Sequence, residues 1–358
     1  RCAPSGSPIT RSGDEMSAVL VTGGAGYIGS HAVKGLRAAG HKVVVLDNLS
    51  AGHRAAVGDT PFVEADVRDS TTVRATLRDH AIEAVMHFAA LLSVSESVSE
   101  PSRYYEWNVR GSLALLNGMV AEGVQRFVLS STCAVYGDRV TPPIAETHPT
   151  APINAYGETK LTVERALVHY GQAYGLRSVA LRYFNASGAD AGGDIGEDHD
   201  PEIHLIPRAI AAACGGEALQ VFGDDYPTAD GTCERDYVHV SDLASGHLLA
   251  LDSLFGRADA AGPDGGSPDP PGPVSRVFNL GTGRPHSVRE VVQAVERVTG
   301  LAVPTLPAPR RPGDPAVLFA SAERIASELG WRPQYTSLDD IVETAWRWHQ
   351  SHPQGFGG

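Results

Sequence analysis

A tyrosine and a lysine one helical turn apart are the residues whose types and spacing best suit chemistry. Tyr156 and Lys160 stand at positions i and i+4 of the helix-like stretch "NAYGETKLTVERALVHY" (154–170), so both side chains project from the same side. A lysine ammonium beside a phenol favours the phenolate and lowers a pKa that is ordinarily about 10. We therefore expect Tyr156 to exchange a proton with a substrate hydroxyl. Alone, the spacing also fits two unrelated surface residues.

Three glycines spaced three residues apart predict a turn that holds a phosphate group. Gly23, Gly26 and Gly29 follow the strand-like "AVLVT" (18–22) and open a helix expected over 27–39. Gly23 permits the tight turn, Gly26 lets the backbone approach a pyrophosphate, and Gly29 lets the helix pack closely. The helix N-terminus supplies free N–H groups and the positive end of the helix dipole. The pattern is typical of a dinucleotide site.

An aspartate at the end of the next strand narrows the dinucleotide to NAD. Asp47 closes "KVVVLD" (42–47), 24 residues after Gly23, where a carboxylate can accept hydrogen bonds from both ribose hydroxyls. The same carboxylate would repel a 2′-phosphate, which favours NAD over NADP. The alternative is an ordinary glycine-rich turn with an acidic helix cap, and the strand, helix and carboxylate together disfavour it.

These residues need a scaffold, and the first half of the chain predicts one. Continuous apolar strands alternate with helical stretches, which indicates a parallel sheet covered on both faces. We expect an α/β protein with a Rossmann-type doubly wound parallel sheet and a smaller C-terminal substrate-binding domain. The strands are expected at 18–22, 42–47, 61–66, 83–89, 126–131 and 178–184.

The amino-acid composition of the chain changes after Phe184. A glycine- and acid-rich loop leads to a helical "LIPRAIAAAC" and a strand-like "LQVFG", and a strand "RVFNLG" and a helix over 287–300 follow. We expect the chain to cross between domains more than once. The expected division is a disordered extension over 1–16, an NAD-binding domain over 17–186 completed by 236–281, a UDP-sugar-binding domain over 187–235 and 282–350, and a Gly/Pro-rich loop insertion over 256–275.

Composition excludes several classes of partner. The 358 residues are 42% hydrophobic, enough for a large α/β core, and the net charge of −13 opposes binding to nucleic acid or an anionic membrane. No apolar run approaches the roughly 20 residues that cross a bilayer. The four cysteines form no C-x-x-C pair, which argues against a zinc site built on cysteine and against a disulfide framework. We expect a cytoplasmic protein.

The motifs resemble one known family when they are taken in order. T-G-G-x-G-x-x-G, the strand end "SSTCAVYG" (130–137) and Y-x-x-x-K are similar to the extended short-chain dehydrogenase/reductase family. The resemblance is closer still to its UDP-glucose 4-epimerases, through "LDNLS", "HFAA", "LRYFNASGA", "FGDDYPTADGTCERDYVHVSDLA", "APRRPGD" and "HPQGF". These signatures span roughly Val19 to Phe356. The resemblance implies a homodimer.

The resemblance also implies a role for each matching residue. Tyr156 would be the acid/base, Lys160 would tune it and bind the nicotinamide ribose, and Thr132 would assist at the sugar O4. The expected NAD site consists of Gly23, Gly26, Tyr27, Ile28, Gly29, Asp47, Asn48, Asp66, Val67, Phe88, Ala89, Asn108, Ser130, Tyr156, Lys160 and Phe184. The expected UDP-sugar site consists of Thr132, Asn185, His204, Leu205, Phe222, Arg235, Val288, Arg311, Asp314 and Leu318, with the two arginines on the pyrophosphate.

The implied chemistry interconverts UDP-galactose and UDP-glucose without net redox change. Tyr156 removes the O4 proton, C4 passes a hydride to bound NAD⁺, and a 4-keto sugar forms. The ketose then swings about the pyrophosphate linkage and takes the hydride back on its other face. The site must therefore anchor UDP firmly and hold the sugar loosely.

Three residues depart from the family pattern. Leu92 stands where many members have a lysine that contacts the cofactor, which predicts weaker or rearranged NAD retention. His204 stands where asparagine is common; its imidazole can still donate to a phosphate or carbonyl. Leu318 is intermediate between a bulky tyrosine, which excludes N-acetyl groups, and a small residue, which admits them. Our hypothesis is some tolerance for UDP-N-acetylhexosamines.

Two further features have a functional and a plain interpretation. The acidic stretch "EDHDPEIH" (197–204) is expected to be a solvated loop that feeds the UDP site, with no metal, because its two histidines are five residues apart on a loop. Cys133 follows Thr132 but has no visible base partner, so we expect a small packing residue and not a nucleophile.

Other functions share much of this pattern. A UDP-N-acetylhexosamine or UDP-pentose 4-epimerase would use the same chemistry. A nucleotide-sugar 4,6-dehydratase needs an Asp-Glu pair after Thr132, where this chain has Cys133 and Ala134. An NAD-binding redox sensor of the same fold tends to lose the catalytic tyrosine, which this chain keeps as Tyr156.

Overall fold

The computed structural model describes residues 17–138, 140–256, 274–311 and 314–357. The expected extension over 1–16 and nearly all of the expected loop insertion over 256–275 lie outside these residues. Among the helices that are described, none combines the length and the apolar character that crossing a membrane requires.

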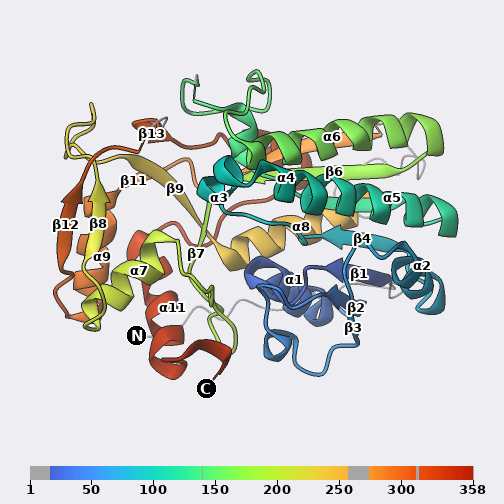
Figure 1. Ribbon diagram of the computed structural model, residues 1–358, viewed down its shortest axis with the longest axis horizontal. Helices are drawn as coiled ribbons and strands as arrows, with labels where there is room; N and C mark the ends of the chain where they lie inside the picture. The colour runs from blue at the N-terminus through green and yellow to red at the C-terminus, as the bar shows by residue number, and fades with distance from the viewer. Residues whose placement is uncertain (1–16, 139, 257–273, 312–313, 358) are drawn as a thin grey trace.

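The larger part of the molecule is built on a seven-stranded sheet whose neighbouring strands are all parallel (Figure 1). The strand order is β10-β6-β5-β4-β1-β2-β3, so the chain starts in the middle, runs to one edge and returns to the other. This order confirms the doubly wound fold. The strands are β1 (Ala18–Thr22), β2 (Lys42–Asp47), β3 (Phe62–Glu64), β4 (Ala84–His87), β5 (Arg126–Ser130), β6 (Arg177–Tyr183) and β10 (Ser275–Leu280).

Helices cover both faces of this sheet because its strands are apolar on both sides. In β1, Val19 and Val21 pack into one core with helices α1 (Tyr27–Ala38) and α8 (Val240–Leu254). Leu20, on the other face, packs into a second core with three other helices. These are α2 (Ser70–Asp79), α5 (Gly111–Glu122) and α6 (Ala155–Tyr174).

The second part of the molecule contains two small sheets and three helices. One sheet has the order β11-β9-β13 with β7 also paired to β9, and the other pairs β8 with β12. Its strands are β7 (Asn185–Ser187), β8 (Leu219–Phe222), β9 (Glu234–His239), β11 (Pro285–Ser287), β12 (Thr305–Ala308) and β13 (Val317–Leu318). A third core lies between α7 (Leu205–Ala213), α9 (Val288–Thr299) and α11 (Leu338–Ser351), which stand together at one end of the molecule (Figure 1).

The chain passes between the two parts through short elements. The expected division between 235 and 236 falls inside β9, which lies wholly in the small sheet, and α8 then returns to the large sheet. Helix α10 (Glu323–Leu329), expected in the smaller domain, packs against β10 and α8. The remaining elements are η1 (Arg54–Val57), α3 (Val94–Ser99), α4 (Pro101–Tyr104), the π-helix η2 (Tyr105–Arg110), η3 (Cys133–Tyr136) and η4 (Gly355–Gly357).

Local sequence fixes both ends of α6, the helix that carries Tyr156 and Lys160. At its start the side chain of Asn154 accepts a hydrogen bond of 2.9 Å from the backbone N–H of Gly157. At its end Gly175 adopts a left-handed conformation with φ of 73°, which glycine tolerates best. The helix is therefore held in a defined register relative to the sheet.

Candidate active site

The glycine turn after β1 has the geometry that the sequence predicts. Gly23 has a left-handed φ of 70°, and a Cβ there would lie 2.4 Å from the backbone nitrogen of Ala89. A Cβ on Gly29 would lie 2.2 Å from the carbonyl oxygen of Gly23. Gly26 is the N-cap of α1. The backbone of this turn is thus open at the N-terminus of a helix, the arrangement that binds a pyrophosphate.

Asp47 lies at the end of β2 and supports this turn directly. Its Oδ2 accepts a hydrogen bond of 2.9 Å from the N–H of Ala25, and its Oδ1 accepts one of 2.9 Å from Leu49. Burial raises the pKa of this carboxyl, and the backbone hydrogen bonds oppose that rise. A carboxylate has about four acceptor positions, so Asp47 can still accept from a ribose.

The other residues expected at NAD gather along the carboxyl edge of the large sheet. This edge is where doubly wound proteins bind ligands. They lie in or after successive elements: Tyr27 and Ile28 in α1, Asn48 after β2, Asp66 and Val67 after β3, Phe88 and Ala89 after β4, Asn108 in η2, Ser130 at the end of β5, Tyr156 and Lys160 in α6, and Phe184 after β6.

Two of these residues are held by contacts that the sequence did not reveal. Asp66 is paired with Arg68, whose Nε and Nη2 each donate a hydrogen bond of 2.8 Å to the carboxylate, and this pairing lowers the pKa of Asp66. Asn108 is buried and bonds both backbone groups of Leu91, at 2.8 Å and 3.1 Å. Asn108 therefore fixes the loop after β4. The i+2 spacing of Asp66 and Arg68 was the only sequence signal for the first pair.

Tyr156 and Thr132 meet at the carboxyl end of β5. The two side chains are hydrogen-bonded to each other, and Thr132 Oγ1 also accepts 3.1 Å from the N–H of Ala134. A threonine that bridges the phenol and the following 3₁₀ turn can position a substrate oxygen between itself and the tyrosine. The structure brings together the two residues expected at O4.

The expectation of a lowered tyrosine pKa is wrong for this structure. Burial raises the pKa of Tyr156 to about 12, and the hydrogen bond with Thr132 only partly offsets that rise. The reason is that Lys160 points elsewhere: its Nζ donates 2.9 Å to the carbonyl of Ser130. The cost of removing a charged phenolate from water therefore dominates.

Lys160 is buried beside the carboxylate of Glu164. Burial lowers the pKa of its ammonium to about 8, and the charge of Glu164, one turn further along α6, opposes this change. Ser130, whose carbonyl accepts from Lys160, also hydrogen-bonds the phenol of Tyr183 through its Oγ at 2.5 Å. Lys160 is thus positioned between the strand end and a buried carboxylate.

A buried ion pair fastens helix α6 to the large sheet. Arg182 on β6 donates to both oxygens of Glu164, from Nε at 3.0 Å and Nη2 at 2.5 Å, and from Nη1 to the hydroxyl of Tyr136 at 2.9 Å. Ser131 also donates to Glu164 at 2.5 Å. The network ties α6 to β5, β6 and η3. Sequence reasoning missed it because its members come from three separate segments of the chain.

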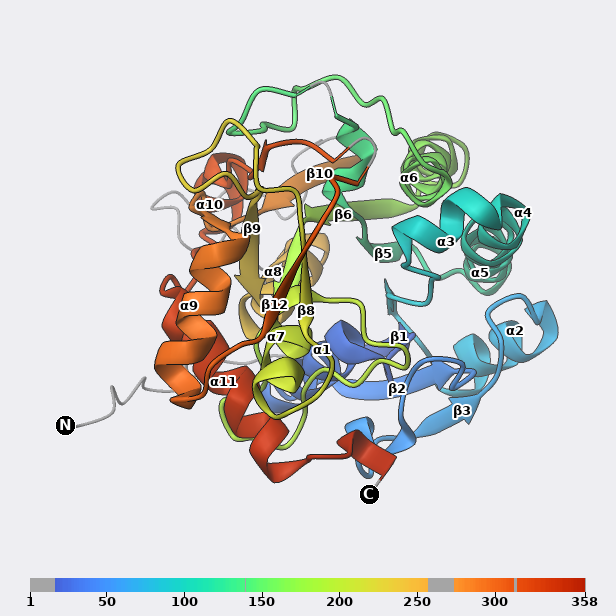
Figure 2. The same ribbon diagram turned by 60° about the vertical axis from the view of Figure 1, so that its left-hand side comes forward.

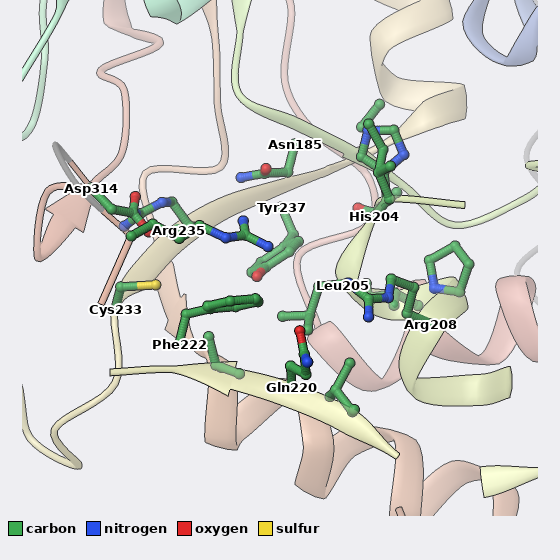
Figure 3. A pocket seen from close by; sticks show the side chains of 18 residues that line it. Asn185, His204, Leu205, Arg208, Gln220, Phe222, Cys233, Arg235, Tyr237 and Asp314 are labelled. Carbon is green, nitrogen blue, oxygen red and sulfur yellow. The ribbon is translucent and has the colours of Figure 1, made fainter. Parts of the chain in front are cut away.

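A pocket of about 190 Å³ lies between β8, β9 and α7 (Figure 3). Eight of the ten residues expected at the UDP-sugar line it: Asn185, His204, Leu205, Phe222, Arg235, Val288, Arg311 and Asp314. Figure 3 shows Arg235 beside Asp314 at one end of the pocket and Arg208 beside Leu205 at the other. The remaining two residues, Thr132 and Leu318, are not part of its lining.

The two expected phosphate-binding arginines have partners that fix their directions. Arg235 pairs with Asp314 and donates 2.7 Å from Nη1 to the carbonyl of Glu234. Arg311 lies over the ring of Phe222, with its Cζ 4.0 Å from the ring centroid. Both guanidinium groups are therefore held in place at the pocket wall, as an anion site needs.

The pocket also contains residues that sequence reasoning missed. Arg208 adds a third cation one turn into α7, Gln220 precedes Phe222 on the same strand by two residues, and Tyr237 follows Arg235 by two. Residues two apart on a strand share a face. The alternation around Phe222 and Arg235 was the signal that could have found Gln220 and Tyr237.

Comparison with known proteins places this arrangement in a family. The sequence model of the NAD dependent epimerase/dehydratase family matches residues 19–259. The chain belongs to this family. It is 50% identical over 340 residues to the UDP-glucose 4-epimerase of Halalkalibacterium halodurans, covering 95% of this chain and 97% of that protein.

Solved structures of similar proteins cover nearly the whole chain. The UDP-glucose 4-epimerase of Brucella ovis in complex with NAD matches with a TM-score of 0.85 and 48% identity, over 92% of this chain and 97% of that one. The UDP-glucose 4-epimerase of Bifidobacterium longum, in complex with NAD⁺ and UDP, matches with a TM-score of 0.86 and 36% identity. The match covers 95% of this chain and 100% of that one.

In this member of the family, Leu318 lies between the pocket and the catalytic helix. It pairs with Arg235 across β13 and β9, and its side chain packs against a core cluster that includes Cys133 and Leu161. Phe184 packs against the same cluster. Leu318 therefore lies between a residue of the pocket lining and a cluster that includes a residue of α6.

Leu92 and Cys133 differ in exposure. Leu92 is 39% exposed in the segment after β4. Cys133 is buried in the cluster beneath Thr132, and burial raises the pKa of its thiol well above the usual value. A thiol with a raised pKa is a poor nucleophile, in agreement with the packing role expected for Cys133.

The expectation that 197–204 is a solvated loop that feeds the UDP site is correct only in part, because Asp200, Pro201 and Ile203 are exposed and His204 lines the pocket but other side chains are buried. Glu197 is only 5% exposed, and the side chains of Glu197, His199, Glu202 and His204 converge. His204 Nδ1 faces Glu197 Oε1 at 2.5 Å. The loop folds back on itself next to Tyr27 and Trp348, which a pattern of alternating acids and histidines did not indicate.

Proposed function

We propose that the protein is a UDP-glucose 4-epimerase that interconverts UDP-galactose and UDP-glucose. The observation that carries the proposal is a pocket lined by eight of the ten residues expected at the UDP-sugar, linked through Leu318 to the catalytic end of α6. The similar proteins are named UDP-glucose 4-epimerases, and the chain matches them over nearly their whole length. One of their structures holds NAD⁺ and UDP.

The glycine turn and Asp47 suit NAD, which supplies a reversible hydride acceptor when it is bound. A Cβ on Gly23 or Gly29 would collide with backbone, so that turn can accept a close pyrophosphate. Asp47 lies at the ribose position and disfavours a 2′-phosphate. Ser130 and Lys160 lie at the end of the sheet where the nicotinamide ribose would bind.

Proton transfer falls to Tyr156 and its hydrogen-bonded neighbour Thr132. In the forward direction Tyr156 takes the proton from the sugar O4 as C4 loses its hydride. After the 4-keto sugar has turned, Tyr156 returns the proton while the hydride goes back to the opposite face. The raised pKa of Tyr156, about 12, means that the buried ammonium of Lys160 and bound substrate must favour the phenolate during the reaction.

The pocket provides the anchor that this rotation needs. Arg235, Arg311 and Arg208 bring three cations to the lining of one pocket, which suits an anionic pyrophosphate. The sugar would extend past Leu318, an apolar side chain that offers it no hydrogen bond. Firm contacts to UDP and weak contacts to the hexose let the ketose turn without leaving.

Leucine at position 318 favours a second substrate class. It is smaller than tyrosine, so we propose slow turnover of UDP-N-acetylhexosamines as well. A UDP-pentose would fit the same site and use the same chemistry. The 4,6-dehydratase alternative lacks its Asp-Glu pair after Thr132, and a redox sensor has no use for the buried Tyr156 and Thr132 pair.

The finer proposals are a homodimer, a cytoplasmic location and a role in galactose metabolism. Val94 and Val98 on α3 and Tyr105 on η2 are exposed apolar side chains beside α6, a surface that a second copy could cover (Figure 2). The three described cysteines are free, which suits a reducing compartment. Galactose metabolism follows from UDP-galactose as substrate.

Retention of isotope at C4 tests the mechanism. UDP-galactose carrying deuterium at C4 is incubated with the protein, and the product is analysed by mass spectrometry and NMR. The proposal predicts UDP-glucose with deuterium still at C4, since the same hydride returns. Loss of the label to solvent, or a dehydrated 4-keto product, would refute it.

A further inference from the structure

Four potential metal ligands converge on one segment between β7 and α7. Glu197, His199, Glu202 and His204 each offer one ligand atom, and these atoms all lie within 4.8 Å of one another. Both imidazoles approach the same carboxylate oxygen: His204 Nδ1 is 2.5 Å and His199 Nδ1 is 3.2 Å from Glu197 Oε1. Glu202 completes the group, with its Oε1 3.4 Å from His204 Nδ1.

This spacing is close to that of ligands around one ion. Zinc binds nitrogen and oxygen at about 2.1 Å, so two ligands of a tetrahedral site are about 3.4 Å apart. The distances within the cluster lie on both sides of that value.

His204 gives a second, independent indication. Its Nδ1 is inaccessible to solvent and faces two carboxylate oxygens, Glu197 Oε1 at 2.5 Å and Glu202 Oε1 at 3.4 Å, but neither contact has the geometry of a hydrogen bond. A buried polar atom without a well-directed hydrogen bond is costly. An ion at the centre of the cluster would satisfy it.

The charges of the cluster also favour a bound cation. Glu197 and Glu202 bring two negative charges into a half-buried site, and the side chain of Glu197 is almost fully buried. One divalent cation would displace the proton that His204 holds against Glu197, neutralise both carboxylates and bind both imidazoles through their lone pairs. We propose that Glu197, His199, Glu202 and His204 form a binding site for a divalent transition-metal ion, Zn²⁺ in particular.

The position of the site gives it a structural role. The carbonyl of Glu197 accepts 3.2 Å from the indole N–H of Trp348 on α11, and the ring of His199 meets the edge of Tyr27 at the start of α1. His204 lines the substrate pocket. An ion here would hold the pocket wall against helix α1, which follows the glycine turn. It would take no part in hydride transfer.

Zinc binding by the NAD-loaded protein tests the proposal. After dialysis against a chelator, the protein is titrated with Zn²⁺ by calorimetry, and its Tm is measured with and without Zn²⁺. We expect one ion per chain and a higher Tm with zinc. His199→Gln should weaken binding at least about tenfold, whereas His286→Gln, which changes a His–Glu pair of 3.7 Å outside the cluster, should not. Equal binding by wild type and His199→Gln would overturn the proposal.

Cobalt binding to the wild-type protein gives a spectroscopic test that does not depend on whether a variant folds. Co²⁺ in a four-coordinate site of nitrogen and oxygen ligands has far stronger visible absorption than the aqueous ion. The proposal predicts these bands, and their loss on addition of Zn²⁺. A spectrum like that of aqueous Co²⁺ would overturn it, whether or not the protein is an active epimerase.

Discussion

At the scale of single residues, the site depends on which charges burial permits. Tyr156 and Lys160 are both buried, and burial moves their pKa values in opposite directions, to about 12 and to about 8. Each shift disfavours the charged form. Tyr156 is therefore a neutral phenol in this structure, and the ammonium of Lys160 and the bound substrate must favour its phenolate before it can accept the proton of the sugar O4. Thr132 keeps the phenol in position throughout.

Replacing Tyr156 by phenylalanine removes the proton acceptor and leaves the rest of the site in place. We expect kcat for UDP-galactose to fall by about 10²- to 10⁴-fold, with the NAD content of the purified protein unchanged. Tyr170→Phe is the matched control, because Tyr170 is on the same helix but bonds the surface residue Asn117. If Tyr156→Phe were as active as this control, Tyr156 would not be the acid/base.

Leu318→Tyr tests the substrate range. The larger ring would fill the space between the pocket and the cluster around Cys133. We expect wild-type protein to convert UDP-N-acetylglucosamine slowly, and Leu318→Tyr to lose that activity while its rate with UDP-glucose changes by less than about threefold. Coupled assays with both sugars measure the ratio. Undetectable turnover of the N-acetyl sugar by wild type at millimolar concentration would remove the proposed tolerance.

At the scale of elements, two helices hold the site, and each does so through one close contact. Helix α1 approaches the glycine turn at Gly29, where a Cβ has no room. Helix α6 is fastened to the sheet through the Glu164–Arg182 ion pair. The contact at Gly29 sets how closely a pyrophosphate can approach the turn. The Glu164–Arg182 pair holds the carboxylate that raises the pKa of Lys160.

Gly29→Ala should abolish NAD retention. The new methyl would lie 2.2 Å from the carbonyl oxygen of Gly23, so α1 must shift away from the turn. Gly35→Ala is the control on the same helix, because its methyl would lie 3.4 Å from Leu248 and meet only ordinary contact. We expect the control to keep its NAD and gain up to about 1 kcal/mol of stability. Cofactor absorbance after gel filtration measures both, and equal retention would contradict the account.

Glu164→Gln should change both stability and pH dependence. Breaking a buried ion pair by removing one partner costs about 3–5 kcal/mol, because Arg182 keeps its charge. The charge of Glu164 raises the pKa of Lys160, so its loss lowers that pKa further below about 8. If activity needs the ammonium, the alkaline loss of kcat/KM moves to lower pH.

The control for this prediction is an exposed pair of the same type. Glu343→Gln breaks a contact of 3.0 Å with Arg347 on the surface of α11, which contributes at most about 1 kcal/mol. Its pH profile should match that of wild type. Urea unfolding and pH–rate profiles of the two variants decide the matter: a Glu164→Gln profile that coincides with wild type would show that Glu164 does not tune Lys160.

At the scale of the whole molecule, the sequence predicted the scaffold better than the contacts within it. The six strands expected up to residue 184 are present because each is a continuous apolar run between turn signals. The domain division was less accurate at β9, whose six residues belong to the small sheet while the chain turns back toward the large one. No local pattern marks such a crossing.

The candidate site shows the same limit. Residues in compact motifs, such as Gly23, Gly29 and Asp47, could be placed from spacing alone. The Glu164–Arg182 pair and the cluster around Glu197 could not, since they depend on how distant segments or a folded-back loop meet in space. The direction of the Tyr156 pKa shift also depends on burial, which a sequence does not state.

Conversion of UDP-galactose by the purified protein tests the central claim most directly. The appearance of UDP-glucose is followed with and without added NAD⁺, with UDP-N-acetylgalactosamine and UDP-arabinose in parallel. The account predicts rapid formation of UDP-glucose, and any dependence on added NAD⁺ reports how firmly a chain with Leu92 retains the cofactor. Turnover of another sugar alone would keep the mechanism and change the substrate. No turnover of any of the three, by protein that contains NAD, would contradict the claim that this is a 4-epimerase.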